Sequence, residues 1–350
     1  MINIPRDEIK SILVINLGGI GDLFFSLPAL RSLRRLYPQS KISLCTLLRS
    51  QEAADNLRCI VDEIFPYQNI FTFYFLRKRR FDMLINLRSM TSHWTALKMS
   101  LLFFFVCAKY RVGRDTQERG FFLNIKLPEA DTAIMHDLDY NLNLMRLLGA
   151  DTTDRNIELK IQDKDNFYID EFLRRNYIQE KDKLIGINPT ATWQTKRWPI
   201  ENFFKVIDEL SKRIDCKIIV TGTREDIPLV NKLNKLSKVK PVMAAGKTSL
   251  GQLIALINRC SLFITNDGGS MHIASILKKP FIAIFGPTDP IRFGTYENYR
   301  EAVILDKTVD CSPCFKKKCR SLKCLKSILP EEVIDIALRL LNGNFRESRK

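Results

Sequence analysis

Short apolar runs alternate with longer amphipathic stretches along most of the chain, and this alternation restricts the fold more than any other feature. Leucines at helical spacing, from Leu27 to Leu36, separate the first two strand-like runs. Strands that alternate with helices form parallel βαβ units, so we expect an α/β fold. The strand-like runs of the first half are SILVINL (11–17), KISLCTL (41–47), FDMLINLRS (81–89) and KYRVGRD (109–115).

The second half begins the same pattern again. Amphipathic helices separate its strand-like runs, which are KLIGIN (183–188), CKIIV (216–220), SLFIT (261–265) and PFIAI (280–284). We predict a pair of doubly wound Rossmann-like domains facing a central cleft, where ligands bind at the carboxyl ends of the strands. The predicted organisation is a first domain at 1–165, a linker region at 166–182, a second domain at 183–330, and a C-terminal helix and tail at 331–350.

Hydrophobic residues make up 45% of the 350 residues, which is enough for two buried cores. The most apolar run, LLFFFVCA at 101–108, is far shorter than the roughly 18–20 residues that span a bilayer. We interpret it as a buried helix, with a membrane-facing patch as the alternative. The first ten residues include acids and no long apolar segment, so they do not resemble a signal peptide and we expect a cytoplasmic protein.

The chain carries 55 Lys and Arg against 39 Asp and Glu, a formal net charge of +16, which suits an anionic partner. Nucleic acid, an anionic membrane and an acidic substrate are the candidates. No helix-turn-helix, zinc-finger or RNP motif accompanies the charge, so we do not expect nucleic acid. The densest basic run of the first half is Arg77, Lys78, Arg79 and Arg80. It is either a solvated helix end or a site for a phosphorylated or membrane-bound acceptor.

Four of the nine cysteines lie close together in the sequence, at Cys311, Cys314, Cys319 and Cys324. Their spacing is compact enough for four thiolates to surround a structural zinc ion or an iron–sulfur cluster, although it matches no standard zinc module. The alternative is a metal-free, redox-sensitive thiol loop. A disulfide framework is not expected in the cytoplasm.

A glycine loop follows the first strand-like run, in the stretch NLGGIGD from Asn16 to Asp22. Glycines between a strand and a helix commonly form a phosphate cradle. These glycines do not match G-x-G-x-x-G, however, and the loop ends in a carboxylate, which repels phosphate. Asp22 is therefore either a cap of the following helix or a group with a chemical role.

The second half offers better groups for a diphosphate. Asp267, Gly268 and Gly269 follow a strand-like run and open a helix, whose free N–H groups suit a phosphate. In the loop PTATWQTKRWP, Lys196 and three hydroxyls can neutralise a diphosphate without a metal. The hydroxyls belong to Thr190, Thr192 and Thr195.

Two further polar residues follow strands of the second half. Glu225 comes after VTGT, where a carboxylate either holds ribose hydroxyls or caps a surface helix. His272 lies one turn into the helix that follows Gly269, and we interpret it as a packing or hydrogen-bonding residue rather than a catalyst.

Several segments together carry a resemblance that covers nearly the whole chain. In their order and intervals they resemble the ADP-heptose:lipopolysaccharide heptosyltransferases of glycosyltransferase family 9. The resemblance implies a GT-B fold, an inverting transfer that needs no metal or other cofactor, and action at the cytoplasmic face of the inner membrane. The segments are INLGGIGDLFFSLPALRSLRRLYP, INPTATWQTKRWPIENF, TNDGGSMHIAS with PFIAIFGPTDP, and CSPCFKKKC.

The resemblance also implies roles for individual residues. Asp22 matches the carboxylate that is taken as the general base. Contacts with the acceptor are expected from Gly18 and Gly19 of the glycine loop and, from the charge of the basic run rather than from the resemblance, from Arg77, Arg79 and Arg80. Contacts with the donor are expected from Thr192, Lys196, Glu225 (or its neighbour Asp226), Asp267, Gly268 and Gly269.

The chain departs from the family pattern at one point that matters. Gly268 stands where the family usually has threonine, so a hydroxyl contact with phosphate is lost. Ala191 likewise stands where some members carry a second threonine. The identity of the donor is therefore less constrained than that of the fold.

We expect an inverting glycosyltransferase that moves a heptose, or a related sugar, from an ADP-sugar to the lipopolysaccharide inner core, as a peripheral protein of the inner membrane. One alternative is a member of the same family with a different donor or another anionic glycan acceptor. A second is a nucleotide-sugar epimerase of GT-B architecture, which needs acid and base groups flanking the sugar. A third is a non-enzymatic protein that binds nucleotides or nucleic acid.

Overall fold

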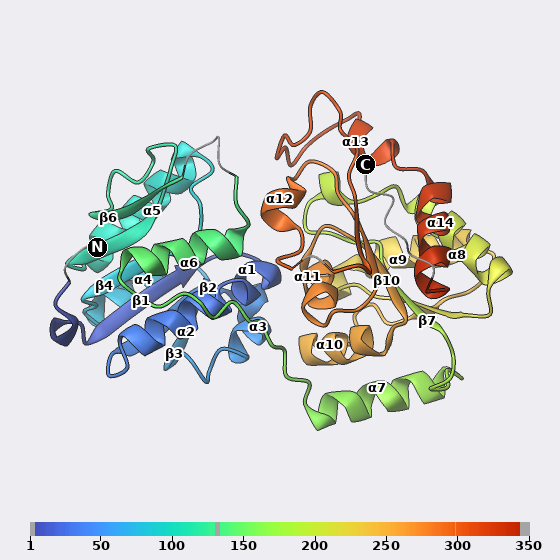
Figure 1. The fold of residues 1–350 in the computed structure, drawn as a ribbon, viewed down its shortest axis with the longest axis horizontal. Helices are drawn as coiled ribbons and strands as arrows, with labels where there is room; N and C mark the ends of the chain where they lie inside the picture. Colours follow the sequence, from blue (N-terminus) through green and yellow to red (C-terminus); the bar gives the residue numbers. More distant parts are fainter. Residues whose placement is uncertain (1–3, 130–133, 298, 344–350) are drawn as a thin grey trace. The chain divides into compact units, whose positions relative to one another are not determined.

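The computed structural model describes residues 4–129, 134–297 and 299–343. The chain divides into two compact units, Met1–Ile157 and Glu158–Lys350 (Figure 1). Each unit is built on a six-stranded parallel sheet with helices on both of its faces. The predicted α/β class with two doubly wound domains is confirmed.

The sheet of the first unit has the strand order β3-β2-β1-β4-β5-β6, so the order reverses between β1 and β4. Its strands are β1 (Ser11–Asn16), β2 (Lys41–Leu47), β3 (Glu63–Tyr67), β4 (Met83–Asn86), β5 (Tyr110–Thr116) and β6 (Ile125–Glu129). Its helices are α1 (Ile20–Phe24), α2 (Leu27–Leu36), α3 (Gln51–Asp55), α4 (Ile70–Lys78), α5 (His93–Val106) and α6 (Asp137–Leu147), with short 3-10 helices at Arg6–Glu8 and Leu48–Ser50.

Two layers of helices cover this sheet. Helix α2 packs beside α6, and α4 packs beside α5. The α4–α5 layer buries Leu76, Met99 and Phe103 in one core with Leu13 and Leu84 of the sheet. Full burial of such a side chain contributes about 1.5–3 kcal/mol, so apolar contacts hold this layer in place.

The second unit repeats the topology with the order β12-β11-β10-β7-β8-β9, which reverses between β7 and β10. Its strands are β7 (Leu184–Asn188), β8 (Lys217–Val220), β9 (Val242–Met243), β10 (Leu262–Asn266), β11 (Phe281–Ile284) and β12 (Ala302–Leu305). Its helices are α7 (Asp163–Arg175), α8 (Ile200–Arg213), α9 (Ile227–Leu236), α10 (Leu250–Arg259), α11 (Gly269–Ile276), α12 (Pro290–Phe293), α13 (Lys323–Lys326) and α14 (Pro330–Leu341), with 3-10 helices at Gln194–Lys196 and Arg224–Asp226.

Helix α8 shows how the sequence pattern becomes packing. Its residues Phe203, Val206 and Leu210 recur at helical spacing and are completely buried. They share one core with Val333 and Ala337 of α14. The C-terminal helix is therefore an integral part of the second unit.

Along the chain, the boundary between the two units lies between residues 157 and 158, whereas we predicted the first domain to end at 165. The segment predicted as a linker overlaps α7, which packs on α10. Asp165 is buried so close to Gly251 of α10 that a Cβ at Gly251 would lie 2.4 Å from its carboxylate. The Tyr168 hydroxyl also donates to the Lys247 carbonyl at 2.7 Å. These contacts make α7 part of the second unit.

Within the described residues, no helix has both the length and the hydropathy that a membrane span requires. The apolar run at 101–108 falls largely in α5 and is only partly buried, unlike the buried helix that we predicted. Phe103 and Val106 lie in the core, whereas Leu101, Phe104 and Phe105 are exposed.

Candidate active site

Asp22, the candidate base of the first unit, lies where the strand order of the sheet reverses. Strands β1 and β4 are neighbours and run parallel, so the loops that follow them leave from the same edge of the sheet. Asp22 follows β1, and Arg88 follows β4. Ligands of doubly wound sheets bind at such a topological switch point, where the strand order reverses.

Both carboxylate oxygens of Asp22 have partners. Oδ2 accepts a hydrogen bond from the Gly19 N–H at 2.6 Å, and Oδ1 forms an ion pair with Arg88. A carboxylate offers about four acceptor positions, so these two contacts leave room for a further donor. The Asp22 side chain is still 19% exposed. It is thus both a cap of α1 and an oriented carboxylate that solvent reaches.

The Asp22 side chain also shapes the glycine loop. A Cβ at Gly18 would lie 2.4 Å from the Asp22 Cβ, so only glycine fits there. The Gly18 N–H donates to the Asn16 side chain at 3.2 Å, and its carbonyl accepts from the Ser50 hydroxyl at 3.1 Å. These contacts hold the loop against the sheet. The acceptor-binding role of Gly18 and Gly19 stays a prediction.

Arg88 begins a series of alternating charges that the sequence analysis missed. Besides Asp22, its Nη1 contacts Asp137 at 3.0 Å. Asp137 also pairs with Arg114 at 3.0 Å, and Arg114 pairs with Glu129 at 2.7 Å. Arg114 is fully buried, and Asp137 and Glu129 are almost fully buried.

Two carboxylates of this network stabilise the positive charge of Arg88. Burial alone disfavours the charge, but Asp22 and Asp137 outweigh it and raise the pKa of Arg88. Losing one member of a buried charge set costs about 3–5 kcal/mol, so the network is sensitive to truncation. One signal in the sequence could have found Arg88, which stands two residues beyond the end of β4, at the edge of the sheet that carries Asp22.

The second unit repeats the arrangement with the signs exchanged. Lys196 follows β7 and Asp267 follows β10, the two strands between which the order reverses. The Lys196 Nζ lies 2.6 Å from Asp267 Oδ2, which also accepts from the Thr288 hydroxyl. The Asp267 side chain is only 2% exposed, and that of Lys196 is 17% exposed. The structure thus brings two of the predicted donor-site residues into contact.

Buried polar contacts join the loops that carry Lys196 and Asp267. Asn266 accepts from the Trp198 N–H at 2.9 Å and donates to the Thr190 carbonyl at 3.3 Å. The Asn188 amide also donates to the Ser270 hydroxyl at 3.0 Å. The two loops are therefore held together by the protein itself, which preorganises the charges that they carry.

Gly268 and Gly269 stand at the start of α11, where the first N–H groups have no partner within the helix. Gly268 has an extended backbone, and a Cβ there would meet no atom within 4 Å. The position therefore accepts a side chain, including threonine. Thr192 is exposed on the loop after β7, whereas Thr195 is buried and its hydroxyl has no partner among the described residues.

Glu225 and Asp226 follow β8 and differ in availability. Asp226 accepts from the Thr223 N–H at 3.0 Å and from its hydroxyl at 2.8 Å, and it lies 3.6 Å from Arg197. Glu225 is exposed, and hydrogen bonds with its own backbone and with Thr223 lower its pKa. Asp226 therefore serves as a cap, and Glu225 is the more available carboxylate.

The basic run lies at the amino ends of the strands of the first sheet, whereas Asp22 lies at their carboxyl ends. Arg77, Arg79 and Arg80 are exposed at the end of α4, where the chain approaches the amino end of β4. Arg79 lies 3.6 Å from Glu63, the first residue of β3. The structure therefore does not bring these arginines together with Asp22, and their role in acceptor binding stays a prediction.

The four clustered cysteines are free thiols in different surroundings. Cys324 is buried, Cys314 is half-buried, and Cys311 and Cys319 are exposed. Across the part of the chain that the structure describes, no three His, Cys, Asp or Glu side chains converge as metal ligands would. The geometry therefore does not fit the zinc or iron–sulfur site that we considered. Burial raises the pKa of Cys324, and a hydrogen bond with Ser321 is the main cause that lowers the pKa of Cys319.

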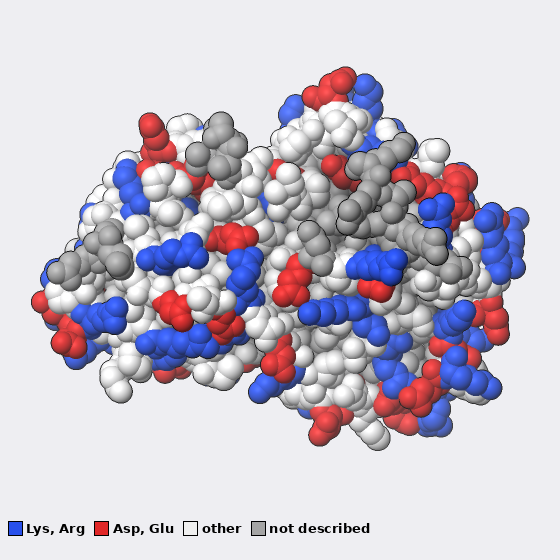
Figure 2. Space-filling model, viewed as in Figure 1, with Lys and Arg blue, Asp and Glu red and all other residues white. Residues whose placement is uncertain are grey.

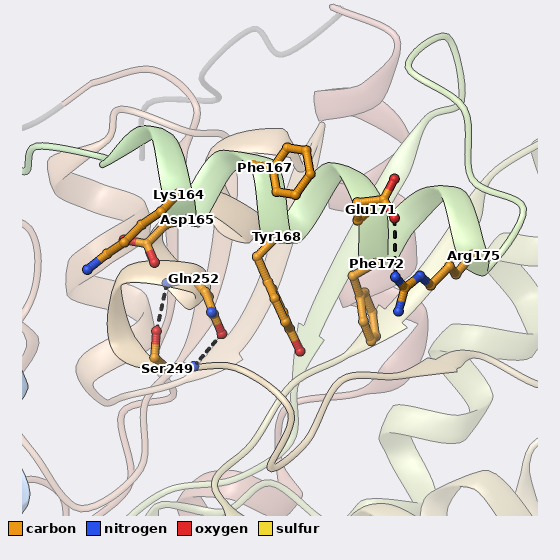
Figure 3. A pocket seen from close by; sticks show the side chains of 9 residues that line it. All are labelled: Lys164, Asp165, Phe167, Tyr168, Glu171, Phe172, Arg175, Ser249 and Gln252. Carbon is orange, nitrogen blue, oxygen red and sulfur yellow. Dashed lines mark hydrogen bonds and ion pairs between the residues drawn. The ribbon is translucent and has the colours of Figure 1, made fainter.

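Two surface features lie apart from these residues. On the face shown in Figure 2, basic and acidic side chains are interspersed, so the positive charge is not gathered into one strip there. A shallow groove of about 750 Å³ runs along α7 (Figure 3) and contains none of the predicted site residues. It is lined by Lys164, Asp165, Phe167, Tyr168, Glu171, Phe172, Arg175, Ser249 and Gln252.

Comparison with known proteins identifies a family and several relatives of the chain. The model of glycosyltransferase family 9 (heptosyltransferase) matches residues 73–325. Lipooligosaccharide heptosyltransferase 2 of Campylobacter jejuni subsp. jejuni serotype O:2 is 34% identical over 168 residues, which cover 46% of this chain and 52%, about half, of that protein. The lipopolysaccharide core heptosyltransferase OpsX of Haemophilus influenzae is 25% identical over 305 residues, 84% of each chain.

Solved structures show the same architecture. A glycosyl transferase family 9 protein from Veillonella parvula is 27% identical with a TM-score of 0.73, and the match covers 95% of this chain and 97% of that one. The ADP-heptose lps heptosyltransferase II of E. coli, at 21% identity, has a TM-score of 0.71 over 95% of this chain and 99% of its own. This second likeness concerns the fold alone, which is the GT-B fold expected from the sequence.

Proposed function

The chain belongs to glycosyltransferase family 9, the heptosyltransferase family, and on that premise we propose that it transfers a heptose from ADP-heptose to an inner-core acceptor of lipopolysaccharide. The predicted family and enzyme class are confirmed by the match over 73–325. The proposal further includes inversion at the anomeric carbon, no requirement for a metal, and action at the cytoplasmic face of the inner membrane.

The observation that carries the proposal is the pair of opposite charges at each topological switch point, where the strand order of the sheet reverses. In the second unit, Lys196 lies beside Asp267 at the start of α11. Asp267 fixes the lysine, and the lysine then stabilises the negative charge that a departing diphosphate gains. The first N–H groups of α11, beside Gly268 and Gly269, offer further donors to the same phosphates. Glu225 is the carboxylate available for ribose hydroxyls.

In the first unit, Asp22 takes the role of general base. The acceptor hydroxyl oxygen attacks C1 of the heptose, its proton passes to the Asp22 carboxylate, and the bond between C1 and the diphosphate oxygen breaks to release ADP. The Gly19 N–H and Arg88 hold the carboxylate in one orientation while leaving it partly exposed. General-base catalysis contributes about 10²–10⁴-fold to such a step. The reaction requires the donor residues and Asp22 to come together around the two substrates.

The direct test is transfer with defined substrates. The protein is incubated with ADP-heptose and with lipopolysaccharide truncated at the inner core, and we expect the acceptor mass to increase by one heptose. The reaction should proceed in excess chelator, and NMR should show the inverted anomeric configuration. A panel of other nucleotide sugars and of non-lipopolysaccharide glycans identifies a different donor or acceptor.

The same assay separates the proposal from the epimerase alternative. Donor incubated without acceptor should stay unchanged apart from slow hydrolysis. An isomerised sugar in that sample, with no transfer when acceptor is added, would refute the transferase proposal.

A further inference from the structure

Helix α5 is apolar on both of its faces. Ala96, Met99 and Phe103 on the inner face are buried in the core of the first unit. On the outer face, Trp94 is 65% exposed and Leu101 is 62% exposed. A helix that is hydrophobic all round is normally buried on every side, so the outer face of α5 is suited to a partner that is not part of the fold.

Helix α4 extends this apolar surface. It packs beside α5, and it exposes Phe71 (75%), Tyr74 and Phe75 while burying Leu76 completely. We call the exposed side chains of the two helices the α4–α5 patch. Large neighbouring apolar groups of this kind mark interaction sites in soluble proteins. The patch consists of Phe71, Tyr74, Phe75, Trp94, Leu97, Leu101, Phe104 and Phe105.

Cations lie directly over the aromatic rings of the patch. The contacts, measured to the ring centroids, are Arg77 over Phe105 at 5.2 Å, Lys78 over Tyr74 at 4.7 Å, Arg79 over Phe75 at 5.2 Å, Lys98 over Trp94 at 5.2 Å and Arg111 over Phe104 at 5.7 Å. The patch therefore presents positive charge and apolar surface at the same place.

Acidic residues are nearly absent from this part of the chain. Residues 70–106 contain Arg77, Lys78, Arg79, Arg80, Arg88 and Lys98 but only one acid, Asp82. The Asp82 carboxylate accepts from the backbone N–H groups of Lys10 and Ser11 at 2.8 and 2.9 Å, at the amino end of β1. The cations of this segment therefore outnumber its acids by six to one.

We propose that the α4–α5 patch docks on the surface of an anionic phospholipid bilayer. Aromatic and aliphatic side chains partition into the boundary between headgroups and acyl chains, and lysines and arginines around them pair with anionic headgroups. This charge complementarity selects the bilayer over other occupants. A second copy of the chain would bring two positive patches together, and protein interfaces are depleted of lysine at their centres.

The inference deepens the proposed function, because it identifies the surface that meets the membrane carrying the acceptor. Helix α5 starts after the loop that contains Arg88, at the carboxyl ends of the strands, where Asp22 also lies. It runs back toward the amino ends of the strands, where β5 begins. The docked surface therefore begins on the side of the unit that holds the base.

The test measures binding of the full chain to vesicles by sedimentation. We expect binding to vesicles that contain phosphatidylglycerol, weakening as salt is raised, and much weaker binding to pure phosphatidylcholine. The variant Leu101→Asp/Phe104→Asp should lose at least about tenfold in affinity, because it removes two inserted side chains and adds negative charge. Phe167→Asp, which alters an aromatic residue of α7 that is 71% exposed, is the matched control and should bind like the wild type.

A second variant tests the charge alone. Lys78→Gln/Lys98→Gln keeps every apolar group of the patch and should weaken binding to phosphatidylglycerol vesicles by about 10–30-fold, with little effect on phosphatidylcholine. Unchanged binding of both patch variants, or no binding by the wild type, would overturn the proposal. So would a concentration-dependent dimer that Leu101→Asp/Phe104→Asp abolishes, since that would make the patch a contact between copies.

Transfer to a water-soluble truncated acceptor separates this inference from the proposed function. Leu101→Asp/Phe104→Asp should keep the wild-type rate with that acceptor, which also shows that it is folded, and lose rate with acceptor in vesicles. If neither the wild type nor the variants transfer heptose, the proposed function fails. If vesicle binding still follows the pattern above, the docking surface stands.

Discussion

The substitution Asp22→Asn isolates the proton-accepting role that we propose for residue 22. Asparagine has the shape of aspartate and keeps one carbonyl oxygen, but its NH2 group cannot accept from the Gly19 N–H or from Arg88 as the second carboxylate oxygen does. Arg88 keeps its contact with Asp137 at 3.0 Å, so the substitution does not leave it unpaired. The change therefore removes the base with little disturbance of the network behind it.

The expected magnitudes differ for stability and for turnover. Hydrogen bonds to charged groups contribute about 1.5–3 kcal/mol, and partial exposure of Asp22 reduces this, so we expect a loss of about 1–2 kcal/mol in the free energy of unfolding of the first unit. Loss of a general base lowers turnover by about 10²–10⁴-fold. That factor corresponds to about 2.7–5.4 kcal/mol in the activation free energy.

The assay combines initial rates with calorimetry. We expect kcat for heptose transfer to fall by the factor above. The Kd for ADP-heptose should stay the same, because the proposed donor residues lie in the second unit. Asp154→Asn is the matched control. Asp154 is also an aspartate of the first unit held by arginines, Arg31 at 3.0 Å and Arg35 at 2.9 Å, and its side chain is 24% exposed. It should retain wild-type turnover.

One result would refute the reasoning directly. If Asp22→Asn turned over at a rate close to that of the wild type, Asp22 would be a helix cap and no more. If donor affinity fell together with turnover, the separation of roles between the two units would be wrong.

Three further outcomes follow from the structure. Gly268→Thr should bind ADP-heptose about 2–10-fold more tightly in calorimetry, since a Cβ there meets no atom and a hydroxyl adds a hydrogen bond, whereas Gly268→Val should not. Lys196→Met should abolish measurable donor binding and lower the free energy of unfolding by about 3–5 kcal/mol, because it leaves the Asp267 carboxylate buried without its cation. Adding Asp267→Asn should restore stability but not donor binding. A Lys196→Met variant as stable as the wild type would contradict the role of the ion pair. Arg31 lowers the pKa of Asp154, mainly by hydrogen bonding, so the roughly 1 kcal/mol that the wild type gains over Asp154→Asn in urea unfolding at pH 7 should disappear as the pH falls below about 4.

The locations of the main strands and of the loops after them could be predicted from the sequence alone. Alternating apolar periodicity is a local property. Strands β1, β2, β4, β7, β8 and β11 fall within strand-like runs, and β5 and β10 extend one residue beyond theirs. The edge strands β3, β6, β9 and β12 were not predicted. Every residue of β3 is only partly buried, so its apolar signal is weak.

The candidate site was predictable only residue by residue. Asp22, Lys196 and Asp267 follow strand ends, where a doubly wound sheet binds its ligands, so the sequence alone indicates them as candidates. Their partners were not predictable. Arg88 is 66 residues from Asp22, and periodicity says nothing about which charges meet across such a distance.

Three features were decided by the tertiary structure. The contact of Lys196 with Asp267 depends on two strands lying side by side, the assignment of α7 to the second unit depends on its packing against α10, and the exposed outer face of α5 depends on which face the sheet covers. An amino-acid sequence determines where a strand or helix forms because that preference is local. It does not reveal which groups pair or which apolar face stays uncovered, because those depend on contacts between residues far apart in the chain.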